Sequence, residues 1–366
     1  MKRTILLIDD KEEFLGALVT ELKKRVGEDA EIQSWVPRKS DVPVETFNKL
    51  LDGSDVQLVV TDYDLTEQGQ LGFFGATVVD WCQNRGIPVG DFSRGHASSL
   101  ATEPNLFELR VPVESNEAAA DYVATVYRGF TAIRDAIDNS DTLLQQRSPA
   151  AALAVMLGAK GMESQFSQYG IRYGGANSSL IDRFAETAPE DIKPEPKKKT
   201  ALLSYIMGHL LLNSVLRFPG PIMSKAALAA YLAVDPSEHD KYSPLFKKAL
   251  YLGPFAGLDS YYWTNLVDEV LGQFDDKVPE ESEFESTGEQ NRTLVEIALE
   301  GVKLTRSPLC PRCEGKNGGF LCPFTGRAVC QRPDCSVVSN VWIPAGARLS
   351  RFERGFYDEW APILGM

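Results

Sequence analysis

The chain has 366 residues, of which 43 % are hydrophobic, and a formal net charge of −13. This length accommodates two or three folded domains, and the surplus of acids argues against the whole chain being a general binder of polyanions. The apolar run before Asp9 is too short for the core of a signal peptide, and no apolar stretch approaches a membrane-spanning length. We therefore expect a cytoplasmic protein without a membrane partner.

Predicted strands and helices alternate along the first third of the chain. The apolar run Ile5–Ile8 predicts a strand, and the spacing of apolar residues after it predicts an amphipathic helix over Lys11–Val26. The further predicted strands are Ala30–Val36, Val56–Leu65, Ile87–Ser93 and Leu106–Pro112, and the further predicted helices are Pro43–Leu51, Ala76–Gln83 and Asn116–Ile137. Five strands alternating with helices predict an α/β domain with a parallel sheet covered on both faces.

Polar side chains stand at the carboxyl ends of three of these strands: Asp9 and Asp10, Asp62, and Ser93. Functional residues of parallel sheets gather at this edge. Three converging carboxylates repel one another unless they share a cation, and oxygen ligands suit Mg²⁺. Such a site favours phosphoryl transfer, in which one carboxylate is the nucleophile. Capping of a helix start explains Asp9 or Asp10 alone, but it does not explain the acid and hydroxyl at the other strand ends.

Two motifs carry a resemblance to a known family. The segments "LLIDD" and "VVTDYDL" are similar to the acidic pair and the phosphoacceptor segment of response-regulator receiver domains, and the resemblance covers residues 1–137. It implies a receiver-like (flavodoxin-like) sheet, phosphorylation of Asp62 by a histidine kinase, Mg²⁺ held by Asp9, Asp10 and Asp62, and Ser93 as the switch hydroxyl.

The end of the fifth predicted strand departs from the family pattern. Receiver domains have a Lys followed by Pro there, whereas this chain has "LRVP". Either Arg110 stands in for the Lys one position early, as a second switch residue, or Val111 occupies the Lys position. Lys and Arg are not interchangeable where the compact ammonium of a Lys must contact a phosphoryl group.

The rest of the chain divides by composition. Residues 138–274 show helical periods broken by Pro and Gly, which predicts a mainly α-helical domain. Residues 275–301 are expected to be an acidic linker, since Asp275–Glu300 carries nine acids against two bases. Residues 302–366 are expected to form a small module with a C-terminal tail.

Five cysteines crowd into Cys310–Cys335. Cys310 and Cys313 form a C-x₂-C pair, and Cys330 and Cys335 form a looser pair, which together supply the four thiolates of a closed, structural zinc site. The spacing between the pairs resembles a zinc ribbon. Cys322 is either a fifth, spare thiol or a substitute ligand.

Three functions are compatible with these features. The leading hypothesis is a receiver-type regulatory or adaptor protein that acts through protein partners and is switched by phosphorylation of Asp62. The first alternative is a nucleic-acid-binding effector that uses the basic segment Lys303–Arg354, with nine Lys and Arg against three acids. The basic residues could equally dock on the acidic segment of the same chain. The second alternative is a Mg²⁺-dependent hydrolase or phosphatase that uses the acidic pocket.

Overall fold

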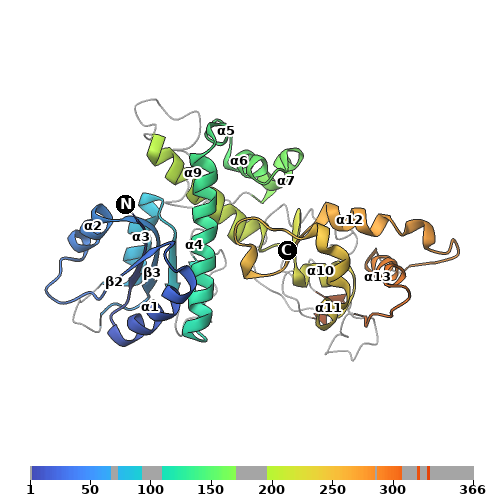
Figure 1. Cartoon of the computed structure of the whole chain (residues 1–366), viewed down its shortest axis with the longest axis horizontal. Helices are drawn as coiled ribbons and strands as arrows, with labels where there is room; N and C mark the ends of the chain where they lie inside the picture. The colour runs from blue at the N-terminus through green and yellow to red at the C-terminus, as the bar shows by residue number, and fades with distance from the viewer. Residues whose placement is uncertain are drawn as a thin grey trace. The chain divides into compact units, whose positions relative to one another are not determined.

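The structure of the chain is a computed structural model that describes residues 2–66, 73–92, 109–169, 196–284 and 287–306, together with the short segments 320–321 and 328–329 (Figure 1). The chain folds into two compact units. Unit 1 comprises residues 1–160 and 171–210, and unit 2 comprises residues 161–170 and 211–366. None of the described helices is both long and apolar enough to cross a membrane.

Unit 1 contains one parallel sheet of five strands in the order β2-β1-β3-β4-β5. The strands are β1 (Arg3–Ile8), β2 (Glu31–Trp35), β3 (Asp55–Asp62), β4 (Val89–Phe92) and β5 (Leu109–Arg110). The helices that connect and cover them are α1 (Glu12–Val26), α2 (Pro43–Gly53), α3 (Gly75–Arg85) and α4 (Asn116–Asp138). The predicted α/β class with a five-stranded parallel sheet is therefore confirmed.

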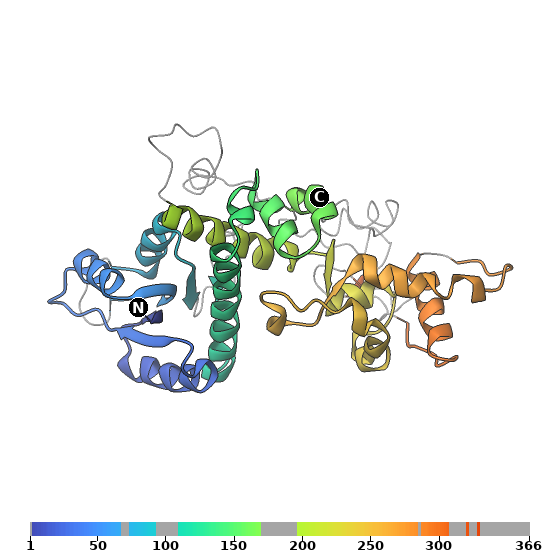
Figure 2. The ribbon, with the colours of Figure 1, turned by 45° about the horizontal axis from the view of Figure 1, so that its top comes forward.

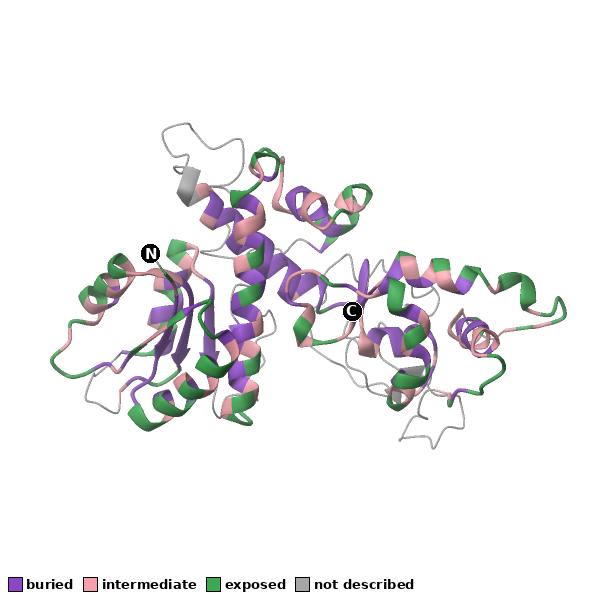
Figure 3. Ribbon diagram, viewed as in Figure 1, coloured by how far each residue is buried: buried purple, intermediate pink, exposed green. Residues whose placement is uncertain are grey.

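The sheet is buried on both faces, and its helices turn their exposed sides outward (Figure 3). On one face, Leu6, Ile8 and Val59 pack with Phe47 of α2 and Val78 of α3. Helices α1 and α4 lie side by side on the other face. Successive strand residues point to opposite faces, so both faces must be apolar, which explains the continuous apolar runs of β1 and β3.

In the described part of unit 1, three further helices extend beyond the sheet: α5 (Asp141–Leu144), α6 (Pro149–Met156) and α9 (Pro196–Leu210). Helix α9 crosses α4 (Figure 2). The ring of Phe130 on α4 meets His209 edge-on, with 5.1 Å between ring centroids. A Cβ at Gly208 would lie 2.2 Å from the Phe130 ring, so a glycine is required for this close approach. His209 is fully buried in this contact.

Unit 2 is mainly helical but also contains a two-stranded antiparallel sheet, β6 (Ile222–Ser224) with β7 (Tyr261–Trp263). Its helices are α7 (Glu163–Gln168), α10 (Lys225–Tyr231), α11 (His239–Tyr242), α12 (Thr264–Gly272) and α13 (Thr287–Ala298), and a π-helical turn spans Leu211–Val215. Buried residues of α10, α11, α12 and α13 share one apolar core.

The segment expected to be an acidic linker contributes to this core. Leu294 and Val295 of α13 are buried there. The carboxylate of Glu296 is also buried and accepts hydrogen bonds from the Leu304 N–H (3.0 Å) and from Lys303 Nζ (2.6 Å). Residues 287–304 therefore belong to unit 2. Although the segment is rich in charged residues, α13 has an apolar face that packs into the core.

Beyond Arg306 the structure describes only a short antiparallel pair, β8 (Phe320–Leu321) with β9 (Ala328–Val329). The predicted zinc ligands Cys310, Cys313, Cys330 and Cys335, and also Cys322, lie outside the described residues.

Candidate metal centre

Three buried aspartates meet at the carboxyl edge of the sheet. Asp9 and Asp10 follow β1, and Asp62 is the last residue of the neighbouring strand β3, where Ile8 pairs with Thr61. The exposed fractions of Asp9, Asp10 and Asp62 are 0 %, 1 % and 6 %. One carboxylate oxygen of each lies within 4.8 Å of the other two. The structure thus brings together the three acids that the sequence singles out.

Local hydrogen bonds orient two of these carboxylates. Asp9 Oδ1 accepts a hydrogen bond from the Lys11 backbone N–H at 2.8 Å, just before α1 begins. Asp62 Oδ1 accepts one from the Tyr63 N–H at 2.9 Å. The Asp9 N–H in turn donates to the carbonyl oxygen of Trp35 at 3.3 Å. Asp9 and Asp62 are therefore each oriented by a backbone N–H just beyond the end of their strand, and the partial positive charge at the start of α1 favours carboxylates nearby.

Gly75, the first residue of α3, also shapes this edge. Its N–H donates to the carbonyl oxygen of Tyr63 at 2.9 Å, and Asp64 forms a β-bridge with Phe74. A Cβ built on Gly75 would lie 2.1 Å from the carbonyl oxygen of Asp62. Only glycine allows α3 to start so close to the end of β3. The sequence pattern does not single out Gly75, because one glycine at a helix start has no spacing signature.

The strand register places Arg110, one of the two predicted switch residues. Asp62 pairs with Phe92 of β4, whose ring meets that of Phe14 edge-on at 5.5 Å between centroids. Arg110 pairs with Asp91 of β4, one position earlier, and its side chain is exposed. Because side chains alternate along strands, Arg110 and Asp62 leave the sheet on opposite faces.

The two other positions that the sequence predicts at this edge of the sheet are Val111 and Ser93. Val111, the residue after Arg110, is buried, and its N–H donates to the carbonyl oxygen of Asp91 at 3.1 Å. Ser93 lies outside the described residues. The register thus places two apolar residues in line with Asp62 across the sheet. One is Val111, which the sequence offered as the alternative occupant of the Lys position, and the other is Phe92, which sequence reasoning did not place there.

The chemistry of the three acids fits a hard divalent cation. Packing three carboxylates within 4.8 Å out of water is costly unless positive charge compensates them. Carboxylate oxygens are the ligands that Mg²⁺ prefers, and it retains waters at its remaining positions. Within the described parts of the chain, this is the one group of three or more acidic, histidine or cysteine side chains placed to share a metal.

The sheet, its strand order and the acidic cluster at its strand ends are compatible with a receiver-like fold. Comparison of the chain with protein-family models, with curated proteins and with solved structures finds no match.

Proposed function

We propose that unit 1 is a receiver-like regulatory domain that binds Mg²⁺ through Asp9, Asp10 and Asp62 and accepts a phosphoryl group on Asp62. The observation that supports this proposal is the convergence of three buried carboxylates from two adjacent strands. Asp62 ends its strand and has its Oδ1 oriented by the Tyr63 N–H. Asp9 and Asp10 approach from the neighbouring strand as the further ligands.

In the proposed reaction, a carboxylate oxygen of Asp62 attacks the phosphorus of a phosphoryl donor. A P–O bond forms to Asp62, and the bond from phosphorus to the donor breaks, so that the donor leaves with the bonding electron pair. Mg²⁺ supplies positive charge that neutralises the oxygens of the transferred group. A histidine kinase or a small acyl phosphate is the donor class that this chemistry requires.

The proposed output is a change in contacts with a protein partner. By strand alternation Arg110 leaves the sheet on the face opposite to Asp62, so we do not assign the signal to a basic side chain of β5. The signal would instead pass through the backbone of Asp62, whose carbonyl oxygen is in direct contact with Gly75, the first residue of α3. A shift of the Asp62 carbonyl would therefore move α3.

The test is covalent modification of the full chain. Acetyl phosphate with Mg²⁺ is expected to add one phosphoryl group, detected by intact-protein mass spectrometry, and the label should map to the peptide that contains Asp62. Asp62→Asn should abolish it. Asp64→Asn is the matched control, because Asp64 is an exposed carboxylate two residues further on. Labelling that persists in Asp62→Asn would contradict the assignment.

For the cysteine-rich segment, we propose a structural zinc bound by Cys310, Cys313, Cys330 and Cys335. The support for this proposal is the spacing of the four thiols in the sequence. A metal in this segment would stabilise a module that is too small to form its own apolar core.

A further inference from the structure

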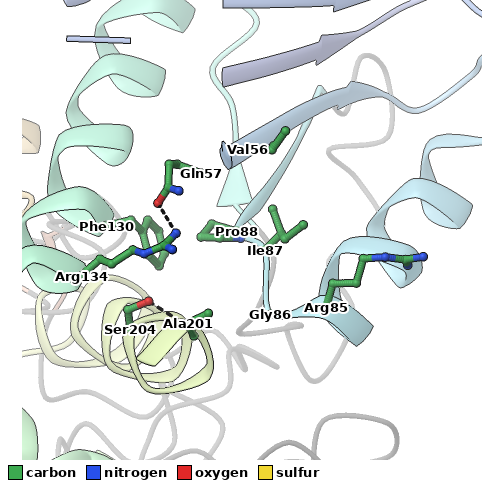
Figure 4. A pocket seen from close by; sticks show the side chains of 10 residues that line it. All are labelled: Val56, Gln57, Arg85, Gly86, Ile87, Pro88, Phe130, Arg134, Ala201 and Ser204. Carbon is green, nitrogen blue, oxygen red and sulfur yellow. Dashed lines mark hydrogen bonds between the residues drawn. The ribbon is translucent and has the colours of Figure 1, made fainter. Parts of the chain in front are cut away.

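A pocket lies at the opposite edge of the same sheet from the acidic cluster, where β3 and β4 begin (Figure 4). Its volume is about 120 Å³. Gln57 and Pro88 line it from the sheet, Phe130 and Arg134 from α4, and Ala201 and Ser204 from α9. All of these residues belong to unit 1.

Arg134 is the charged group of this pocket. Its Nη1 donates to Gln57 Oε1 at 2.8 Å and lies 3.6 Å from Asp55 Oδ1, while Gln57 Nε2 donates to the same Asp55 oxygen at 2.7 Å. These contacts hold the guanidinium in one orientation. Among the described residues, both polar contacts of Arg134 use Nη1. Its Nε and Nη2 hydrogens are therefore available to a ligand.

The second arginine at this pocket has a different role. Figure 4 shows the Arg85 side chain extending away from Pro88 and Phe130, whereas the Arg134 guanidinium reaches from α4 toward Pro88. Arg85 donates to the carbonyl oxygen of Trp81 at 2.9 Å and to Asn48 Oδ1 at 2.8 Å. Arg85 thus adds positive charge at the rim, and Arg134 supplies the directional donors.

The lining specifies the ligand class. The lining contains no carboxylate, and Asp55, which pairs with Arg134 at 3.6 Å, approaches Nη1, so Nε and Nη2 remain as charged donors. The Nε and Nη2 edge of an arginine matches the two oxygens of a carboxylate. Part of the remaining wall is apolar, including Pro88, Phe130 and Ala201, and the volume of about 120 Å³ suits a ligand body no larger than one ring or a short branched chain. Inorganic phosphate would leave these walls uncovered.

We propose that this pocket binds a small monocarboxylate with an apolar body. The carboxylate pairs with the Nε and Nη2 of Arg134, and the apolar body lies against Phe130 and Pro88. Because the ligand touches the starts of β3 and β4 together with α4 and α9, it stabilises the packing of α9 against α4 and the sheet. This site is separate from the acidic cluster, which lies at the carboxyl edge.

Benzoate is a suitable probe, and saturation-transfer NMR with the full chain measures its binding. We expect a dissociation constant on the order of 1 mM, as for a ligand of this size. Benzamide, which keeps the ring but not the charge, and inorganic phosphate, which keeps the charge but not the ring, should each bind at least about tenfold more weakly. No saturable benzoate binding, or equal binding of benzamide or phosphate, would overturn the proposal.

Two variants locate the binding. Arg134→Gln removes the charge and should weaken benzoate binding roughly tenfold or more. Ser204→Leu fills the pocket without altering Arg134, so it should also remove binding. Ser204 is buried, and its hydroxyl donates to the carbonyl oxygen of Ala201 within α9, so the substitution breaks no hydrogen bond with another element in the described structure. Lys49→Gln, at an exposed position on α2, is the charge control and should bind as the wild type does. Unchanged affinity in both pocket variants would show that benzoate binds elsewhere.

Discussion

The carbonyl oxygen of Asp62 and the α-carbon of Gly75 are in such close contact that a Cβ at position 75 would lie 2.1 Å from the oxygen. This contact joins the end of β3 to the start of α3 beside the acidic cluster. The position of α3 and the position of the Asp62 backbone are therefore set together.

Gly75→Ala should consequently disturb both stability and cation binding. The added methyl group forces the Asp62 carbonyl to move, which we expect to cost about 1–3 kcal/mol of unfolding free energy, as for other overpacked sites. Gly16→Ala is the matched control, because Gly16 lies within α1 and a Cβ there meets nothing within 4 Å. The control should be stabilised by about 0.5–1 kcal/mol. Urea unfolding of both proteins measures the difference, and equal stabilities would contradict the close contact.

The buried carboxylate of Glu296 gives a second prediction. Its Oε1 accepts the Leu304 N–H, and its Oε2 accepts Lys303 Nζ, but the Lys303 side chain is 84 % exposed. An exposed ion pair contributes little, so the buried hydrogen bond should dominate. Glu296→Ala removes the acceptor of the Leu304 N–H and is expected to destabilise unit 2 by about 1–3 kcal/mol, whereas Lys303→Met should cost less than about 1 kcal/mol, in chemical unfolding.

Glu281→Ala, at an exposed position, serves as the control for this pair and should leave stability unchanged within about 0.5 kcal/mol. If Glu296→Ala behaves like this control, then residues 302–306 are not anchored through that carboxylate.

We expect His239 to make the stability of unit 2 depend on pH. Its Nε2 lies 2.8 Å from the Tyr262 hydroxyl, and burial, followed by the charge of Lys225, lowers the His239 pKa from its usual value of 6.5, although Asp240 and Asp259 oppose this. The folded state thus favours neutral histidine. This contribution is fully present above the unfolded pKa of 6.5 and is lost as pH falls below it through the lowered folded pKa.

Unfolding midpoints should therefore fall when the pH is lowered from neutral toward the acidic side of the histidine range. In His239→Gln the side chain does not titrate, so the same change of pH should lower the midpoint less. An identical pH dependence in the two proteins would assign the effect to other groups.

The cysteine spacing predicts one zinc ion per chain. Cys330→Ser should lose zinc, as measured by elemental analysis of the purified protein, because it removes a thiolate from the predicted set. Cys322→Ser should retain zinc if the fifth thiol is spare. Loss of zinc in Cys322→Ser with retention in Cys330→Ser would exchange the two residues in the ligand set.

Much of unit 1 follows from sequence periodicity. The helix predicted over Lys11–Val26 is observed as Glu12–Val26, and the helix predicted over Asn116–Ile137 ends one residue later. The acidic cluster could be predicted because parallel strands bring their carboxyl ends to one edge. These signals are local or depend only on strand direction, which is why one sequence is sufficient to detect them.

Other features depend on contacts between distant residues. The strands Ile222–Ser224 and Tyr261–Trp263 are too short to show alternation, and their pairing joins segments far apart in the chain. In α13, the charged residues conceal an apolar face formed by Leu294 and Val295. The close contact at Gly75 likewise exists only in the folded chain, so periodicity could not reveal it.

Divalent-cation binding by the acidic cluster can be measured by titrating the metal-free chain with Mg²⁺ in isothermal calorimetry. We expect one saturable site that Asp62→Asn weakens by roughly tenfold or more, since a charged ligand is lost. Asp64→Asn should titrate as the wild type does. A wild-type chain with no saturable Mg²⁺ binding, or an Asp62→Asn variant with wild-type affinity, would contradict Mg²⁺ binding by the acidic cluster.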